Sequence, residues 1–375
     1  MPSVLYIAEK IDMPEAFLLK GVHEAGWDIA LFLAPWDPYF ETMTNSSFNV
    51  MSMELHRGTS NRAVREIRRY VQDHKPDVVH CLRKQRVVSH VFKAVRKLDV
   101  PLIGLETRAR SLHALNPLAK SVLLKPRVDK VVCVANSVRL HLENEGVPRE
   151  RLVTIYKGHD VHWYDRYEPA DFGEFEIPDG EFVVGCVAKM RPQKGIDFLL
   201  QAIKFLPPEP RVHFLLVGRV FDERISDLAS TNRTTHQIHL PGFRPDAARL
   251  MGSCDVFALP SLRNEGLPIA LLEAMSQAVP AIVTPIGGMK EVVEHRVSGR
   301  IVRPGDPQDI ARSITTFVKD RRYCYECGQN ARKRIREHFN VDRTILQTLR
   351  LYNDLVSPSR DENLRDPPGS SPVAP

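Results

Sequence analysis

Residues 259–289 read LPSLRNEGLPIALLEAMSQAVPAIVTPIGGM, and this stretch decides the fold. Pro268 suits the first turn of a helix, where a missing N–H does no harm, and apolar residues follow it at helical spacing. The pattern therefore places Glu265 in the loop at the helix N-terminus and Glu273 on the helix body. Two glutamates on a helix are often only solvated charges. A helix N-terminus, however, offers N–H groups and a positive dipole end, which favour an anion or ligand hydroxyl groups.

Strand-like apolar runs alternate with helical patterns on both sides of this stretch. In the second half the expected strands are 182–188, 212–218, 255–260, 281–284 and 300–302, and the expected helices are 195–205, 223–230, 246–251, 268–277, 288–293 and 307–318. In the first half the expected strands are 3–8, 28–34, 77–80, 101–105, 130–135 and 152–156. The expected helices there are 14–25, 61–73, 84–98, 115–124 and 137–145, with an aromatic-rich loop at 35–49. Continuous apolar strands alternating with helices predict parallel sheets covered on both faces, the α/β class.

The alternation stops once, and this interruption suggests the domain organisation. Residues 166–181 combine prolines and glycines with acidic residues, so we expect a linker between domains 1–165 and 182–340. An amphipathic helix at 341–356 is long enough to pack back on the first domain. Residues 357–375 are charged and rich in proline and serine, so we expect a disordered tail. Ligands of parallel sheets bind beyond the carboxyl ends of the strands, where residues 261–265 and 284–288 fall.

The composition is that of an ordinary soluble protein of two domains, with 375 residues, 43% hydrophobic and 26% charged. The six cysteines are scattered and complete no metal site. No run approaches about 18 apolar residues, and no leader is recognisable, so we expect a cytoplasmic protein. The absence of G-x-G-x-x-G argues against a dinucleotide-dependent dehydrogenase.

Four segments, taken in order, resemble one family. They are VAKMRPQKGIDFLLQAI (187–203), HLPGFRPDAARLMGSCDVFALPS (239–261), the E-x7-E spacing of Glu265 and Glu273, and TPIGGMKEVVEHRVSGRIVRPGD (284–306). Together they are similar to the donor domain of the retaining GT-B glycosyltransferases of family 4, and residues 134–160 resemble the family's bridging segment. The resemblance implies two Rossmann-like parallel-sheet domains facing across a cleft, with the C-terminal helix returning to the first. The implied reaction is transfer of a sugar from a nucleotide diphosphate sugar, most readily a UDP-sugar.

The resemblance also implies roles for particular residues. It implies that Glu273 accepts hydrogen bonds from the ribose, and that Lys189 and Lys194 neutralise the diphosphate as it leaves. The residues with an implied catalytic role are Glu265, Lys189 and Lys194. The implied donor-binding residues are Lys189, Lys194, Glu265, Gly266, Leu267, Pro268, Ile269, Glu273, Thr284, Gly287 and Gly288. No Asp-x-Asp pair occurs, which fits lysine neutralisation without a metal or other cofactor.

The sequence departs from the family at several positions. Lys189 stands where arginine is usual and therefore lacks the bidentate fork. Ala278 replaces a helix-ending glycine, so strain is expected there. In the first domain residues 8–17 replace a glycine-rich loop, and the family's acceptor-side histidine is absent. The remaining acceptor-side candidates are His80, Glu106, Arg108, Arg110 and His113.

Basic residues are concentrated in the first half of the chain. Residues 55–130 hold eighteen Lys/Arg against six Asp/Glu, a difference of +12, whereas the whole chain carries +6. We therefore expect an anionic or lipid-linked glycan acceptor, as in envelope polysaccharide and lipopolysaccharide biosynthesis, or peripheral contact with an anionic inner membrane face. Nucleic acid is disfavoured because no nucleic-acid-binding motif accompanies the charge. Two alternatives stay open: a nucleotide-sugar epimerase or phosphorylase, and a non-catalytic nucleotide-sugar-binding paralogue.

Overall fold

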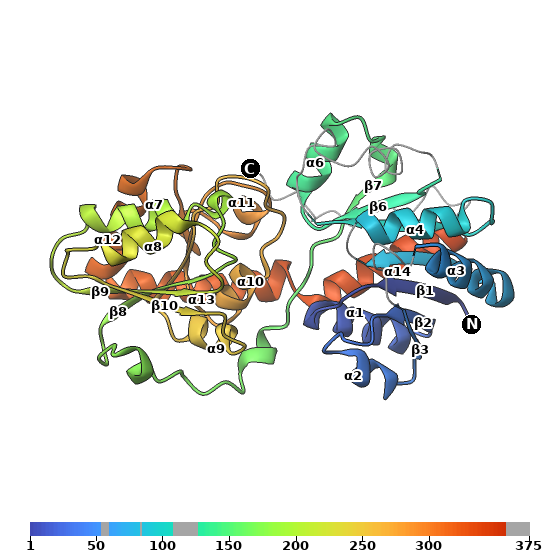
Figure 1. Ribbon diagram of the computed structural model, residues 1–375, viewed down its shortest axis with the longest axis horizontal. Helices are drawn as coiled ribbons and strands as arrows, with labels where there is room; N and C mark the ends of the chain where they lie inside the picture. Colours follow the sequence, from blue (N-terminus) through green and yellow to red (C-terminus); the bar gives the residue numbers. More distant parts are fainter. Residues whose placement is uncertain (54–59, 83–84, 108–126, 358–375) are drawn as a thin grey trace. The chain divides into compact units, whose positions relative to one another are not determined.

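The protein folds into two α/β units, each built on one parallel sheet (Figure 1). The computed structural model describes residues 1–53, 60–82, 85–107 and 127–357. The first unit comprises Met1–Gly158 and Val341–Pro375, and the second comprises His159–Asn340. The predicted fold class is confirmed, and the apolar strands explain it because the central strands of each sheet are buried on both faces.

The first unit holds a seven-stranded sheet in the order β3-β2-β1-β4-β5-β6-β7. Its strands are β1 (Ser3–Ala8), β2 (Asp28–Leu33), β3 (Asn49–Ser52), β4 (Val78–Leu82), β5 (Leu102–Glu106), β6 (Lys130–Cys133) and β7 (Leu152–Thr154). Its helices are α1 (Met13–Glu24), α2 (Phe40–Thr44), α3 (Ser60–His74), α4 (Gln85–Val95), α6 (Asn136–Asn144) and α14 (Val341–Val356). The sequence missed α2 and β3, because the segment that holds them has turn formers and little apolar periodicity.

The last helix returns to the first unit, as predicted. A Cβ added to Gly21 of α1 would lie 2.3 Å from Cδ1 of Ile345 on α14, so the Ile345 side chain packs directly against the α1 backbone. Tyr352 of α14 is fully buried beside Tyr6 of β1 and Trp27. Burial of the apolar stripe of α14 explains why a chain segment so late in the sequence belongs to the first unit.

The second unit holds a six-stranded sheet in the order β10-β9-β8-β11-β12-β13. Its strands are β8 (Phe182–Val187), β9 (Val212–Val217), β10 (Gln237–Gly242), β11 (Val256–Leu259), β12 (Ala281–Val283) and β13 (Gly299–Ile301). Its helices are α7 (Ile196–Ala202), α8 (Glu223–Ser230), α9 (Ala247–Gly252), α10 (Ile269–Ser276), α11 (Met289–Val292), α12 (Pro307–Lys319) and α13 (Arg321–His338). The strand order reverses between β8 and β11, which is where open α/β sheets bind ligands. The sequence missed β10, a half-exposed edge strand that contains a proline.

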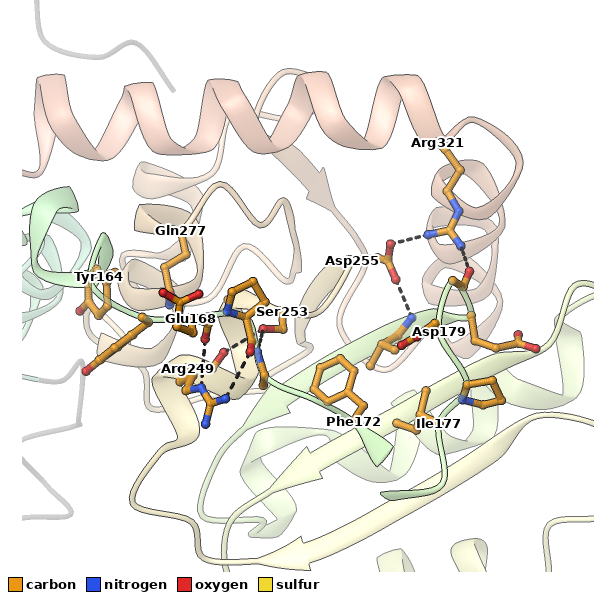
Figure 2. Close-up of a pocket in the computed structure, with 18 of the residues that line it drawn as sticks. Tyr164, Glu168, Phe172, Ile177, Asp179, Arg249, Ser253, Asp255, Gln277 and Arg321 are labelled. Atoms are coloured by element: carbon orange, nitrogen blue, oxygen red, sulfur yellow. Dashed lines mark hydrogen bonds and ion pairs between the residues drawn. The ribbon is translucent and has the colours of Figure 1, made fainter. Parts of the chain in front are cut away.

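The segment expected to be a linker, residues 166–181, packs on the second unit. Arg249 donates to the carbonyls of Glu168 and Pro169, and Ala170 N donates to Ser253 Oγ at 2.7 Å. The segment encloses a cavity of about 750 Å³ near Val183 and Asp255, at the amino ends of β8 and β11 (Figure 2). The chain therefore passes between the units at residues 158–159 and 340–341.

Some expectations fall outside the described residues, namely the helix at 115–124 and nearly all of the tail at 357–375. None of the described helices combines the length and apolar character needed to cross a bilayer.

Candidate functional site

Three loops meet at the carboxyl ends of β8, β11 and β12, which are neighbours in the second sheet. Leu262 N, after β11, donates to the carbonyl of Gln193, after β8, at 2.8 Å. Gly288 N, after β12, donates to the carbonyl of Gly266 at 2.6 Å. These backbone bonds join the three loops into one cluster at the point where the strand order reverses.

Two glycines allow the loops to approach so closely. Gly195 has φ +65°, and a Cβ there would lie 2.2 Å from the carbonyl oxygen of Pro260. Gly287 has φ +62°, and a Cβ there would lie 2.7 Å from the carbonyl of Glu265. Each position combines a left-handed backbone with a backbone contact, so glycine is required at both.

Glu265 is the buried acid of this cluster, with 5% of its surface exposed. Its Oε1 accepts hydrogen bonds from the ammonium of Lys194 and from Ser261 Oγ, the latter at 2.5 Å. The hydroxyl of Thr284, which is fully buried, donates to the carbonyl of Ser261. The cluster thus holds Glu265 in one orientation, and the hydrogen bond from Thr284 fixes the loop that carries Ser261 and Glu265.

Glu273 lies on α10, half-buried, and differs from Glu265 in its surroundings. No hydrogen bond or ion pair to its carboxylate is present among the described residues. Burial raises the pKa of this carboxyl to about 7. A carboxylate that has lost water without gaining a protein partner suits a ligand that supplies hydroxyl donors.

Lys189 follows β8 and is exposed, and within the described parts of the chain it forms no ion pair. The segment Gly266–Ile269 leads into α10, with Pro268 as the N-cap residue. The N–H groups of the first helical turn have no acceptor within the helix. The cluster therefore offers two ammonium groups and a helix N-terminus, a combination that can neutralise a diphosphate.

Sequence reasoning missed part of this arrangement. Ser261 was not predicted as a partner of Glu265, and only the spacing of four residues between them could have suggested it. The expected strain at Ala278 is present, because its φ is +60°. No group of three or more His, Cys, Asp or Glu side chains within the described ranges is placed to hold a metal ion.

Of the acceptor-side candidates, the structure describes His80 and Glu106. His80 is buried in the first sheet, where its Nδ1 contacts the hydroxyl of Tyr352 at 2.6 Å, and Tyr352 in turn donates to Tyr6 at 2.6 Å. Glu106 ends β5 and is also buried. His80 therefore serves the core of the first unit. The candidates Arg108, Arg110 and His113 lie outside the described residues.

Comparisons with known proteins cover most of the chain. Residues 168–334 match the family described as Glycosyl transferases group 1, and residues 17–163 match Glycosyltransferase Family 4. The uncharacterized glycosyltransferase MJ1178 of Methanocaldococcus jannaschii is 25% identical over 88% of this chain and 91% of its own length. The lipopolysaccharide core mannosyltransferase LpcC of Rhizobium leguminosarum is 26% identical over 62% of this chain and 67% of its own. Two further curated relatives match over only 54% and 50% of their own length.

Solved structures share the fold over most of the chain. Anabaena Alr3699/HepE, solved in complex with UDP-glucose, superposes with a TM-score of 0.75 at 22% identity. The match covers 94% of this chain and 100% of that one. At this level of identity the likeness establishes the two-domain architecture. It does not identify the ligand of this chain.

Proposed function

This chain belongs to the family 4 glycosyltransferases, which transfer a sugar from a nucleotide sugar with retention, and we propose that its donor is a UDP-sugar. We propose an anionic or lipid-linked glycan of envelope polysaccharide or lipopolysaccharide biosynthesis as the acceptor. The donor is supported by the structural likeness to a protein solved with UDP-glucose, and the acceptor by the likeness to a lipopolysaccharide core mannosyltransferase.

The observation that carries the proposal is the loop cluster around Glu265. In this proposal Lys189 and Lys194 neutralise the diphosphate, and the N–H groups of Gly266, Leu267 and Ile269 assist them. Thr284, Gly287 and Gly288 complete the cluster. Each cation placed where negative charge develops in the transition state lowers the barrier to departure of the leaving group.

Glu273 binds the other end of the donor in this proposal. Glu273 is the fifth residue of α10, so its backbone lies about 6 Å along the helix axis from the first helical residue at roughly 1.5 Å per residue, and Glu265 precedes the helix in the loop. That spacing suits two positions along one extended nucleotide sugar. A ribose with two vicinal hydroxyls can satisfy both oxygens of the Glu273 carboxylate.

The chemistry requires no covalent enzyme intermediate. The acceptor hydroxyl attacks the anomeric carbon on the face from which the diphosphate leaves. The bond from the sugar to the phosphate oxygen breaks, the new glycosidic bond forms, and the departing phosphate oxygen takes the acceptor proton. The two lysines act by charge alone, so no metal enters the proposal.

Only some of the basic residues of 55–130 support the proposal of an anionic acceptor or membrane surface. Arg68 donates to the carbonyls of Lys93 and Ala94, and Arg127 donates to three carbonyls near the end of α4. These two arginines therefore serve the fold. The exposed lysines and arginines of the same region remain available for an anionic partner, so binding of an anionic acceptor or membrane surface stays part of the proposal.

A two-stage experiment tests the proposed function. First, the melting temperature of the full chain is measured with UDP-, GDP- and ADP-sugars, because a donor that binds the folded state raises it. Second, the stabilising donor is incubated with and without extracted lipid-linked glycans, and the sugar is followed by mass spectrometry. Acceptor-dependent transfer with retention is expected. Turnover of the donor without an acceptor would instead indicate an epimerase or phosphorylase, and binding without turnover a non-catalytic paralogue.

A further inference from the structure

A second basic residue, Arg219, follows β9, the strand that pairs with β8, and Lys189 follows β8. The parallel register of β8 and β9 runs from Phe182 opposite Val212 to Val187 opposite Val217. It continues past the strand ends, because Met190 pairs with Val220. Met190 N donates to the carbonyl of Arg219, and Phe221 N donates to the carbonyl of Met190, both at 2.9 Å. Lys189 is therefore directly opposite Arg219.

The neighbouring pair shows that side chains opposite each other share a face here. The guanidinium of Arg191 lies over the ring of Phe221, 5.0 Å from its centroid. Met190 is fully buried, whereas Lys189, Arg191 and Arg219 are exposed. Neighbouring strands are about 4.8 Å apart, so the Lys189 and Arg219 side chains start from adjacent positions on one surface.

The backbone beneath them is rigid. Gly218 has φ +135°, and a Cβ there would lie 1.9 Å from the carbonyl oxygen of Ala188. Gly218 N also donates to the carbonyl of Gly242 at 2.7 Å. These contacts fix the backbone after β8 and β9 against the end of β10, so the Cα atoms of Lys189 and Arg219 keep their relative positions.

Neither cation has a counter-charge in the described part of the chain. Asp222, three residues beyond Arg219, is buried and already paired with Arg224 at 2.7 Å. Glu265 is paired with Lys194. Like charges directly opposite each other on neighbouring strands are unfavourable. An anion bound between the two side chains would offset this repulsion.

We propose that Arg219 is a further binding residue for the donor diphosphate, acting together with Lys189. This inference rests on the proposed function. The ammonium of Lys189 supplies a point charge, and the planar guanidinium of Arg219 supplies the paired N–H donors that match two phosphate oxygens. Lys189 and Arg219, which follow two adjacent strands, would together provide a point charge and a pair of parallel N–H donors for the diphosphate.

The test is isothermal titration of the full chain with UDP, UMP and uridine. Arg219→Ala should weaken UDP binding by about tenfold or more, weaken UMP binding less, and leave uridine unaffected. Arg219→Lys should lose part of the affinity, because the charge remains and the fork is lost. Introducing Lys189→Arg into Arg219→Ala should restore UDP affinity, since a guanidinium then returns to the same surface. Arg211→Ala, an exposed arginine at the other end of β9, is the matched control and should bind UDP as the wild type does.

The outcomes separate this inference from the function on which it rests. If the wild type binds UDP and Arg219→Ala binds it equally well, Arg219 has no role and the inference is overturned. Equal losses for UDP and uridine would also overturn it, because Arg219 would then contact the nucleoside. If the wild type does not bind UDP, the proposed UDP-sugar donor fails and this inference fails with it.

Discussion

Lys194 and Glu265 form an ion pair that joins the loop after β8 to the loop after β11. Only 6% of the Glu265 side chain and 21% of the Lys194 side chain are exposed. The acid that the sequence places at the N-terminus of a helix thus orients one of the two lysines expected to bind the donor. A diphosphate that approaches Lys194 meets an ammonium group already held in position.

Lys194→Ala should reduce transfer by roughly 100-fold or more, because a cation that stabilises the leaving group is lost. It should also lower the melting temperature, since Glu265 would be left buried with Ser261 as its remaining partner in the cluster. Both effects are measurable by steady-state kinetics and thermal unfolding. Lys204→Ala, an exposed lysine after α7, is the control and should change neither. Wild-type turnover of Lys194→Ala would contradict the role given to this loop.

Glu273→Gln should separate stability from function. Burial raises the pKa of Glu273 to about 7, so the folded state holds a proton that the unfolded chain releases near pH 4.5. The wild type should therefore lose stability as the pH rises from about 4.5 to 7, and the variant should not. At pH 8 we expect the variant to be more stable by about 1–2 kcal/mol and to bind the donor more weakly. Urea unfolding at several pH values and titration with the donor check the two halves of this prediction.

His80 should make the first unit sensitive to acid. Burial lowers its pKa to about 3, so the folded state keeps it neutral while the unfolded chain protonates it near pH 6.5. Stability should be complete above pH 6.5 and decline as the pH falls from there towards 3. His80→Phe should weaken this decline, whereas the exposed His74→Gln should leave it unchanged. An identical pH profile for His80→Phe and the wild type would show that another group controls the acid response.

Gly195→Ala should cost more stability than Gly180→Ala. Both glycines have positive φ, but an added Cβ at Gly195 meets the carbonyl of Pro260 at 2.2 Å, whereas at Gly180 nothing lies within 4 Å. We expect about 1 kcal/mol for backbone strain alone at Gly180, and several kcal/mol at Gly195, together with loss of donor binding. Chemical denaturation of the two variants gives the comparison, and equal losses would mean that the loops after β8 and β11 separate easily.

Ala278→Gly should stabilise the protein. Ala278 ends α10 with φ +60°, a conformation that costs an alanine about 1 kcal/mol more than a glycine. The substitution should raise the melting temperature by a few degrees and leave the donor affinity unchanged. Ala274→Gly, inside the same helix, is the opposite control and should be destabilising.

The positions of the glutamates show what sequence patterns can predict. Pro268 and the apolar spacing after it placed Glu265 in a loop and Glu273 on α10, and both placements are confirmed. The edge strand β10 and the pair α2 and β3 were missed, because half-exposed segments lack a strong apolar period. Segment 166–181 was predicted to be a linker because it is rich in prolines, glycines and acidic residues. The hydrogen bonds that attach it to the second unit involve residues distant in the sequence, and its composition does not predict them.

By itself, the sequence determined the α/β class, the parallel strands, the return of the last helix and the family, because each of these depends on local periodicity or on ordered motifs. Only the tertiary structure decided which side chains meet. It paired Lys194 with Glu265 across 71 positions, placed Lys189 opposite Arg219, and buried His80 against Tyr352. Strand order and register set these contacts, and both arise from packing of the whole sheet, which residue spacing along the chain does not encode.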